Sequence, residues 1–226
     1  MTTNFEGFGP KVREWFQGLE ADNSREYFTG SRDFFEGSIR GQMEALLAEL
    51  VDKFGGAVKM FRQNRDIRFS PDKSPYKTHT YGVIYGSSIA DNLYASISAR
   101  GLVAGSGYYM MARDQLERYR DEVADDSHGP QLMKLVATAE DAGLELWGES
   151  LATAPRGYPK EHERIELLRR KSLALGATLH FGRGISRTNG LEFVTETWRA
   201  AGPVSRWLDE HVGASTMPTD RARRRR

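Results

Sequence analysis

Three short runs with β-type patterning lie close together in the middle of the chain, and their spacing constrains the fold most strongly. The runs cover 78–85, 93–99 and 102–111, with a Gly86–Asn92 connection and an Arg100–Gly101 turn between them. Parallel neighbours need a crossover of roughly a dozen residues or more, and these connections are shorter. We therefore predict that the three runs pair as an antiparallel sheet.

Apolar residues at helical spacing come before and after these strands. Asn23 and Glu26 form a capping-box-like pair, which predicts a helix over 24–54 with a break at Gly30 or Gly37. Helices are also expected after the strands. The last of them covers 191–212, with a break at Gly202–Pro203. Runs of helices, then strands, then helices favour an α+β fold with an antiparallel sheet flanked by helices.

The length and composition favour one domain. The chain has 226 residues and no shift in composition that would mark a linker, so we predict a single domain over 1–213. Residues 214–226 contain almost nothing apolar and are expected to form a disordered, Arg-rich tail. Residues 220–226 hold five Arg and one Asp, a sum of +4, so the remaining residues sum to −3 for a net charge of +1. Global charge therefore does not indicate nucleic-acid binding.

Several classes of site and location are excluded or disfavoured. The chain has no cysteine, which excludes thiolate catalysis, disulfides and Cys-ligated metals. It has no apolar run long enough to cross a membrane and no signal-peptide pattern, so we expect a cytoplasmic protein that does not bind membranes. None of the five histidines has a partner at a metal-ligand spacing such as HExxH, so no metal site is predicted. No cofactor is indicated.

The densest mixture of charged and aromatic residues lies at 64–79, NRDIRFSPDKSPYKTH. Arginine offers a planar fork that suits phosphate or carboxylate, and lysine offers a point charge. Two Ser-Pro steps stiffen the backbone. This combination predicts an anion-binding site whose candidate residues are Arg65, Asp66, Arg68, Asp72, Lys73, Tyr76, Lys77 and His79. The alternative is a structural loop in which Asp66 and Asp72 neutralise Arg68 and Lys73.

A second basic segment, APRGYPKEH, covers 154–162 and supplies Arg156, Lys160 and His162. If the fold brings it against the first segment, the two would line one basic cleft, and His162 could transfer protons near neutral pH. Taken alone, His162 is more simply an exposed residue at the start of a helix. The glycine-rich stretch 101–109 lacks the ending of a phosphate-binding loop and is expected to be strand.

The segment RDIRFSPDKSPYKTH resembles the signature of a bacterial and fungal family known as domain of unknown function 2461. Other parts match in order: NSREYF, LYASISARGLVAGSGYYM, APRGYPKEHERIELLRRKS and PVSRWLDEHV. One departure is Tyr27, where that family is expected to carry another bulky aromatic residue. The resemblance covers nearly the whole chain except the Arg-rich tail and implies a single compact domain. It implies no activity, ligand or catalytic residue.

The leading hypothesis is a cytoplasmic protein that binds an anionic, phosphate-bearing ligand in a cleft lined by both basic segments. If the protein is an enzyme, phosphoryl or acyl transfer or hydrolysis fits best, with Arg68 and Lys73 stabilising negative charge and Asp66 or His79 moving protons. The alternative is a non-enzymatic nucleic-acid-binding or protein-interaction module that uses the Arg-rich tail and surface tyrosines. The sequence leaves open whether the protein is an enzyme.

Overall fold

The computed structural model describes residues 4–88, 90 and 92–218. The chain divides into two compact units. Unit 1 contains residues 1–105 and 177–198, and unit 2 contains residues 106–176 and 199–226. The buried apolar residues form two clusters that follow the same division, so each unit has its own hydrophobic core. The single domain over 1–213 stays a prediction.

The main sheet has six strands, and it confirms the predicted α+β class and the antiparallel pairing. The strand order is β2-β3-β4-β5-β7-β6. Strands β2, β3 and β4 lie in unit 1, β6 lies in unit 2, and β5 and β7 have residues in both. The bounds are β2 (Ala57–Met60), β3 (His79–Tyr85), β4 (Asn92–Ser98), β5 (Gly101–Tyr108), β6 (Glu145–Trp147) and β7 (Leu173–His180). Two short strands, β1 (Gly7–Phe8) and β8 (Ile185–Ser186), form a separate antiparallel pair.

The helical segment before the sheet is interrupted where the sequence predicts. It consists of α1 (Pro10–Ala21), α2 (Arg25–Gly30), α3 (Arg32–Phe34), the π-helix η1 (Phe35–Gly41) and α4 (Gln42–Phe54). The break follows Gly30, whereas Gly37 lies inside the π-helix. The cap of α2 is Ser24, whose hydroxyl accepts a hydrogen bond from the Tyr27 amide. Asn23 is therefore not the cap, because its side chain is bonded elsewhere.

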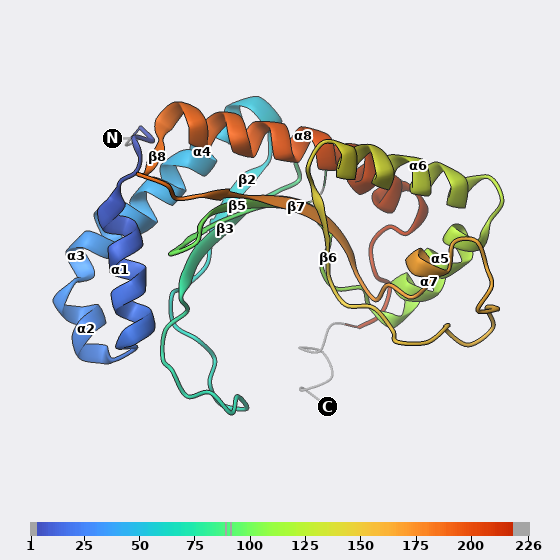
Figure 1. The fold of residues 1–226 in the computed structure, drawn as a ribbon, viewed down its shortest axis with the longest axis horizontal. Coiled ribbons are helices and arrows are strands. Elements are labelled where there is room, and N and C mark those ends of the chain that lie inside the picture. Colours follow the sequence, from blue (N-terminus) through green and yellow to red (C-terminus); the bar gives the residue numbers. More distant parts are fainter. Residues whose placement is uncertain (1–3, 89, 91, 219–226) are drawn as a thin grey trace. The chain divides into compact units, whose positions relative to one another are not determined.

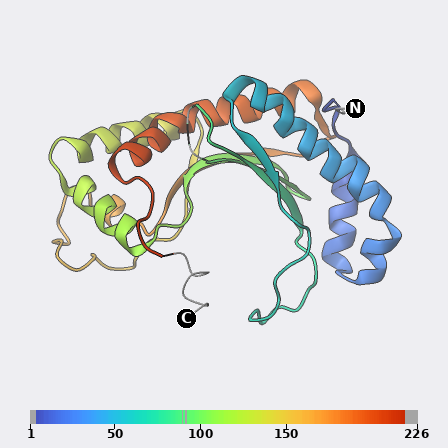
Figure 2. The ribbon, with the colours of Figure 1, turned by 180° about the vertical axis from the view of Figure 1, so that it is seen from behind.

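The core of unit 1 lies between the sheet and two helices. Figures 1 and 2 show α4 and the first part of α8 (Arg187–His211) on the same side of strands β2–β4. Trp198 of α8 is fully buried, meets Phe54 edge-on and donates its indole N–H to the Tyr94 carbonyl. The alternating residues of β3 and β4 that face these helices, such as Ile84 and Ile97, are fully buried. The opposite side of the same strands is therefore the side available to a ligand.

Unit 2 packs the helices α5 (Arg113–Ala124), α6 (His128–Asp141) and α7 (Ile165–Leu168) with the C-terminal part of α8. The predicted break at Gly202–Pro203 is wrong, because α8 continues through Pro203 to His211. Proline has no N–H and so removes one helical hydrogen bond. Buried residues on both sides of it, Ala201 and Val204, hold the helix in the core of unit 2 nevertheless.

The start of the predicted tail is held by α5 within unit 2. Asp114 accepts hydrogen bonds from the Ser215 hydroxyl and the Thr216 amide, at 2.7 Å each. These bonds hold the Asp114 carboxyl's pKa well below its ordinary value, the Ser215 bond contributing most. The Arg-rich part of the tail, 219–226, lies outside the described residues. No helix in the described part of the chain is long and apolar enough to span a membrane.

Candidate functional site

The first basic segment forms the long connection between β2 and β3, residues 61–78, which we call basic loop 1 (Figure 1). Its two arms pair with each other near the sheet. Asn64 and Tyr76 form an antiparallel bridge, the Arg65 amide donates to the Pro75 carbonyl at 2.8 Å, and the Lys77 amide donates to the Gln63 carbonyl at 3.0 Å. The base of basic loop 1 therefore continues the β2–β3 hairpin.

Tyr76 anchors basic loop 1 to the helices of unit 1. Only 7% of its surface is exposed, and its ring stacks on Phe28 with centroids 4.2 Å apart. The Asn23 side chain accepts from the Tyr76 amide at 3.0 Å and donates to the Tyr76 carbonyl at 3.1 Å. This use of Asn23 explains why Ser24 caps α2. The contacts of Tyr76 favour a structural role over the predicted role in ligand binding.

Two predicted anion-binding arginines are paired with aspartates of their own loop. Arg68 donates to both Asp66 carboxylate oxygens, at 2.9 Å and 2.6 Å, and Arg65 is paired with Asp72. The pKa of each aspartate is held well below its ordinary value, mainly by the hydrogen bond from its arginine. The Lys73 amine donates to the Ile67 carbonyl at 3.0 Å. Asp66 therefore pairs with Arg68 as in the alternative of a structural charged loop, but Asp72 pairs with Arg65 and not with Lys73.

The charges of basic loop 1 do not cancel. Residues 61–78 contain five Arg or Lys and two Asp, which gives +3. After the two pairs are removed, the cations that remain are Arg62, Lys73 and Lys77. Among the described residues, no carboxylate oxygen lies within 4.0 Å of these three cations or of His79.

Lys77 lies close enough to Arg62 and to His79 for the charges to affect one another. Burial lowers the pKa of the Lys77 amine, and the neighbouring charge of Arg62 lowers it further. Burial likewise lowers the pKa of the His79 imidazole, with a second contribution from Lys77. The Lys77 amine also donates to the carbonyls of Arg62 and Asn64. The chain thus holds two cations, Arg62 and Lys77, near each other although they repel, and the ionisable His79 imidazole lies near Lys77.

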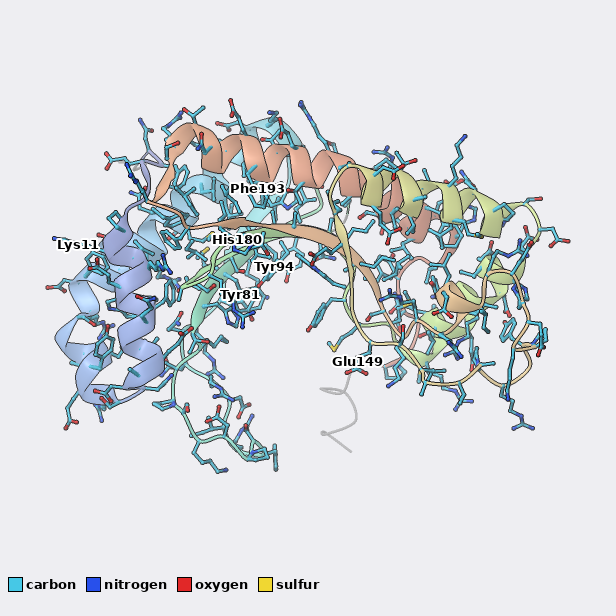
Figure 3. All side chains as sticks on the ribbon, in the orientation of Figure 1. Lys11, Tyr81, Tyr94, Glu149, His180 and Phe193 are labelled. Carbon is cyan, nitrogen blue, oxygen red and sulfur yellow. The ribbon has the colours of Figure 1, made fainter. Side chains whose placement is uncertain are left out.

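A group of aromatic rings lies beside these cations. Phe61 and Tyr81 are stacked, with centroids 4.5 Å apart and planes 15° apart, and the Lys77 amine lies 5.4 Å from the centre of the Tyr81 ring. Tyr94 of β4 lies 5.7 Å from Tyr81. In Figure 3, Tyr81 and Tyr94 lie on the side of the strands opposite to Phe193 of α8. We call the set Phe61, Arg62, Lys77, His79, Tyr81 and Tyr94 the cation–aromatic face.

The sequence pattern predicted only part of the cation–aromatic face. It indicated Lys77 and His79 but not Phe61, Arg62, Tyr81 or Tyr94. Alternate residues of a strand point to the same side, so the pattern His79, Tyr81, Tyr85 could have indicated an aromatic face on β3. The contributions of Phe61 and Tyr94 depend on the pairing of β3 with its neighbours, which the sequence alone does not give.

The second basic segment, residues 154–162, lies in unit 2 and is called basic loop 2. Arg156 and Lys160 are exposed. The Tyr158 hydroxyl donates to Asp121 at 3.0 Å, and burial, this hydrogen bond and the aspartate charge raise the Tyr158 pKa to about 12. His162 Nδ1 accepts from the Arg164 amide at 3.0 Å, so the ring is held at the end of the loop.

Arg164 follows basic loop 2 and is one of the few buried charged residues in the described chain, with 4% of its surface exposed. Its guanidinium donates to the Ala124 carbonyl at 2.9 Å, to Asp126 at 3.1 Å and to Glu163 at 2.5 Å. Arg164 therefore ties this segment to the end of α5. No local sequence pattern indicates its role, because its burial depends on the tertiary fold.

Basic loop 1 belongs to unit 1 and basic loop 2 to unit 2, and the predicted cleft between them stays a prediction. A hollow of about 350 Å³ does occur within unit 1, between α1, the β4–β5 turn and the end of β7. Arg13, Arg100 and His180 contribute to its lining. None of the site residues predicted from the sequence lines this hollow, so it gives no support to their role.

The fold and the candidate site define an α+β protein with an antiparallel sheet that carries cations and aromatic rings on one side. The chain belongs to the family described as conserved hypothetical protein (DUF2461), which matches residues 11–207. The family resemblance found in the sequence is thereby confirmed. No curated protein matches the chain. The family description includes no activity, so a functional proposal has to be built from the site itself.

Proposed function

We propose that the protein binds a small phosphate-bearing ligand with a planar ring, such as a nucleotide, at the cation–aromatic face. The observation that carries the proposal is the position of Lys77 and His79 beside the Tyr81 ring, with Arg62 near Lys77 and no carboxylate oxygen of the described residues within 4.0 Å of the three. Like charges held together lower the stability of a fold unless something compensates for them. A phosphate group bound between them would provide that compensation through charge-assisted hydrogen bonds.

The aromatic rings support the proposal that the ligand contains a planar ring. Tyr81 and Tyr94 are partly exposed, and Lys77 and His79 lie beside the Tyr81 ring. Aromatic side chains on a sheet surface stack against flat ligands such as nucleobases, at about 1–3 kcal/mol per base. A ligand with a phosphate and a planar ring would therefore use both kinds of side chain, whereas inorganic phosphate would use only the cations.

The geometry supports binding more than chemistry. The sequence suggested that Arg68 stabilises developing charge and that Asp66 moves protons, but these two groups are paired with each other. His79 is the predicted proton carrier that remains, because its lowered pKa keeps the imidazole neutral and able to accept a proton near pH 7. We propose a binding function on this ground. A cytoplasmic location accords with this binding function and stays a prediction.

Isothermal titration calorimetry with AMP, ribose 5-phosphate and pyrophosphate tests the proposal. We expect AMP to bind most tightly, and Lys77→Met to weaken AMP binding by about 10- to 100-fold, since a hydrogen bond to a charged group contributes about 1.5–3 kcal/mol. Arg68→Gln and Lys73→Met are matched controls on the same loop and should bind AMP normally. Equal losses in all three variants, or no binding of any anion to the wild type, would contradict the proposal.

The nucleic-acid alternative predicts different results in the same assays. Phosphate-backbone binding weakens steeply with salt, and under that hypothesis deletion of residues 220–226 removes it. The present proposal expects the deletion to leave AMP affinity unchanged, because none of the deleted residues belongs to the cation–aromatic face. A short single-stranded RNA that binds only when 220–226 are present would support the alternative instead.

The proposal also predicts the direction of the pH dependence. The free protein holds the His79 pKa below 6.5, and a bound phosphate raises it, so protonation of His79 and ligand binding favour each other. Affinity for cyclic AMP, whose own charge is constant in this range, should therefore rise as the pH falls from about 8 to about 5.5. His79→Gln should flatten this dependence. An unchanged pH profile in that variant would show that His79 does not contact the ligand.

A further inference from the structure

A carboxylate and two imidazoles lie together in unit 2, at a place that the proposed function does not use. Glu122 is in the last turn of α5, His128 is the first residue of α6, and His211 is the last residue of α8. His128 Nδ1 lies 2.5 Å from Glu122 Oε2, and His211 Nδ1 lies 3.4 Å from the same oxygen. The three ligand atoms all lie within 4.8 Å of one another. Two ring nitrogens therefore lie near one carboxylate oxygen.

These side chains have the chemistry and spacing of a metal site. Imidazole nitrogen and carboxylate oxygen are common ligands of zinc and of other divalent first-row ions. Ligands of a tetrahedral zinc ion at about 2.1 Å are separated from one another by about 3.4 Å. The His211–Glu122 separation of 3.4 Å matches this value, whereas the His128–Glu122 separation of 2.5 Å is a hydrogen-bond contact that would have to lengthen to admit an ion. All three side chains are partly exposed, which leaves a route from solvent.

The charges around the cluster favour a cation. Helices α5 and α8 both end here, and a helix C-terminus carries a partial negative charge. Residues 121–126, DEVADD, contain four carboxylates and no cation. The start of α6 carries a partial positive charge. The Asp125 carboxylate offsets this charge, because it accepts hydrogen bonds from the Ser127 and His128 amides at 2.8 Å and 2.9 Å. Arg164 is the nearby cation, and it is bonded to Asp126, Glu163 and the Ala124 carbonyl.

Neighbouring groups hold the two rings in position. The ring of His211 packs against Trp207, with centroids 4.8 Å apart, and against the ring of His128, with centroids 4.3 Å apart. The backbone of His128 is fixed by the bond from its amide to Asp125. Ligands that are oriented before the ion arrives lose less conformational freedom on binding it. No spacing in the sequence indicates the cluster, because His211 joins the other two residues only through the packing of α8.

We propose that Glu122, His128 and His211 form a binding site for a divalent transition-metal ion of the zinc type, with a fourth position open to water. Three protein ligands and one open position are typical of zinc sites that bind or activate a small molecule. The ion would also connect the ends of α5, α6 and α8 within unit 2. Without an ion, Glu122 can only form hydrogen-bonded pairs with the histidines, and the experiment must distinguish these two cases.

Cobalt(II) titration of the tag-free, full-length protein tests the proposal, because cobalt reports its coordination geometry through visible absorption. We expect one equivalent to produce the intense visible bands of a four-coordinate nitrogen and oxygen site, and one equivalent of zinc to abolish them. Absence of any saturable spectral change would overturn the proposal, since it would show that the cluster forms hydrogen bonds only.

Three variants locate the ion. His211→Gln and Glu122→Gln should each weaken zinc affinity by at least about 100-fold, because loss of residues that merely support a ligand already costs about 10- to 100-fold. His180→Gln removes an exposed histidine of unit 1 and should bind zinc as the wild type does. Equal zinc affinity in His211→Gln and the wild type would overturn the proposal.

A measurement on the wild type covers the case in which a variant fails to fold. The histidine ring signals in the NMR spectrum can be followed during zinc titration, and the chain has five histidines. We expect the signals of His128 and His211 to change together at one equivalent, with the other three unchanged. If zinc changes other histidines first, the site is elsewhere and the proposal fails, whatever the variants show.

Discussion

Replacement of Tyr76 with alanine is expected to lower the free energy of unfolding of unit 1 by about 3–5 kcal/mol, the range found for removal of a large buried aromatic side chain. The ring is buried and stacks on Phe28, so its loss leaves a cavity between basic loop 1 and the helices. The bonds between the Tyr76 backbone and Asn23 depend on the same close packing. Urea denaturation followed by circular dichroism, with amide hydrogen exchange in β3 and β4, measures the effect.

Phe69 provides the matched control for this prediction. It is an aromatic residue of the same loop, but 85% of its surface is exposed. Phe69→Ala should therefore change stability by less than about 0.5 kcal/mol, as is usual for surface positions. A similarly small effect for Tyr76→Ala would mean that basic loop 1 is not anchored in the core. The geometry of the cation–aromatic face would then be unsupported.

Replacement of Arg164 with methionine is expected to destabilise unit 2 by about 2–4 kcal/mol. Methionine keeps much of the buried volume but cannot donate to the Ala124 carbonyl. The carboxylates of Asp126 and Glu163 are largely exposed and return to water at little cost. The loss therefore arises mainly from the unpaired carbonyl and from the released connection to α5. Thermal and urea denaturation of the full chain provide the measurement.

Arg156 is the corresponding control in basic loop 2. Its side chain is exposed, so Arg156→Met should leave stability within about 0.5 kcal/mol of the wild type. The pair of variants separates a structural arginine from a candidate ligand-binding arginine in the same stretch of sequence. If Arg164→Met were as harmless as Arg156→Met, the inferred connection between this segment and α5 would be wrong.

The sequence predicted the architecture well where local pattern decides it. The short connections around β3, β4 and β5 required antiparallel pairing, and the break in the first helical segment occurs after Gly30 as expected. The predicted break at Pro203 failed because burial of its neighbours in unit 2 overrides a local helix-breaking signal. The predicted cap at Asn23 failed because a partner far along the chain, Tyr76, takes its side chain.

The candidate site was less predictable, because the cations that stay available to a ligand depend on which charged side chains pair in the fold. The sequence shows Arg65 and Arg68 as attractive anion ligands, but Asp72 and Asp66 occupy them in the folded loop. Lys77 and His79 become the stronger candidates only because the fold places both beside the Tyr81 ring and Lys77 near Arg62. The Glu122, His128 and His211 cluster likewise exists only through the packing of three helices.

An NMR titration of the wild-type protein with AMP tests the central claim most directly. The ring signals of His79 and Tyr81 report from the cation–aromatic face, without any substitution that could disturb the fold. The account predicts that both signals shift in a saturable way and that the His79 pKa rises toward or above its ordinary value of 6.5 in the complex. If AMP binds and leaves both signals unchanged, or if no phosphate-bearing ligand binds, the cation–aromatic face is not the functional site.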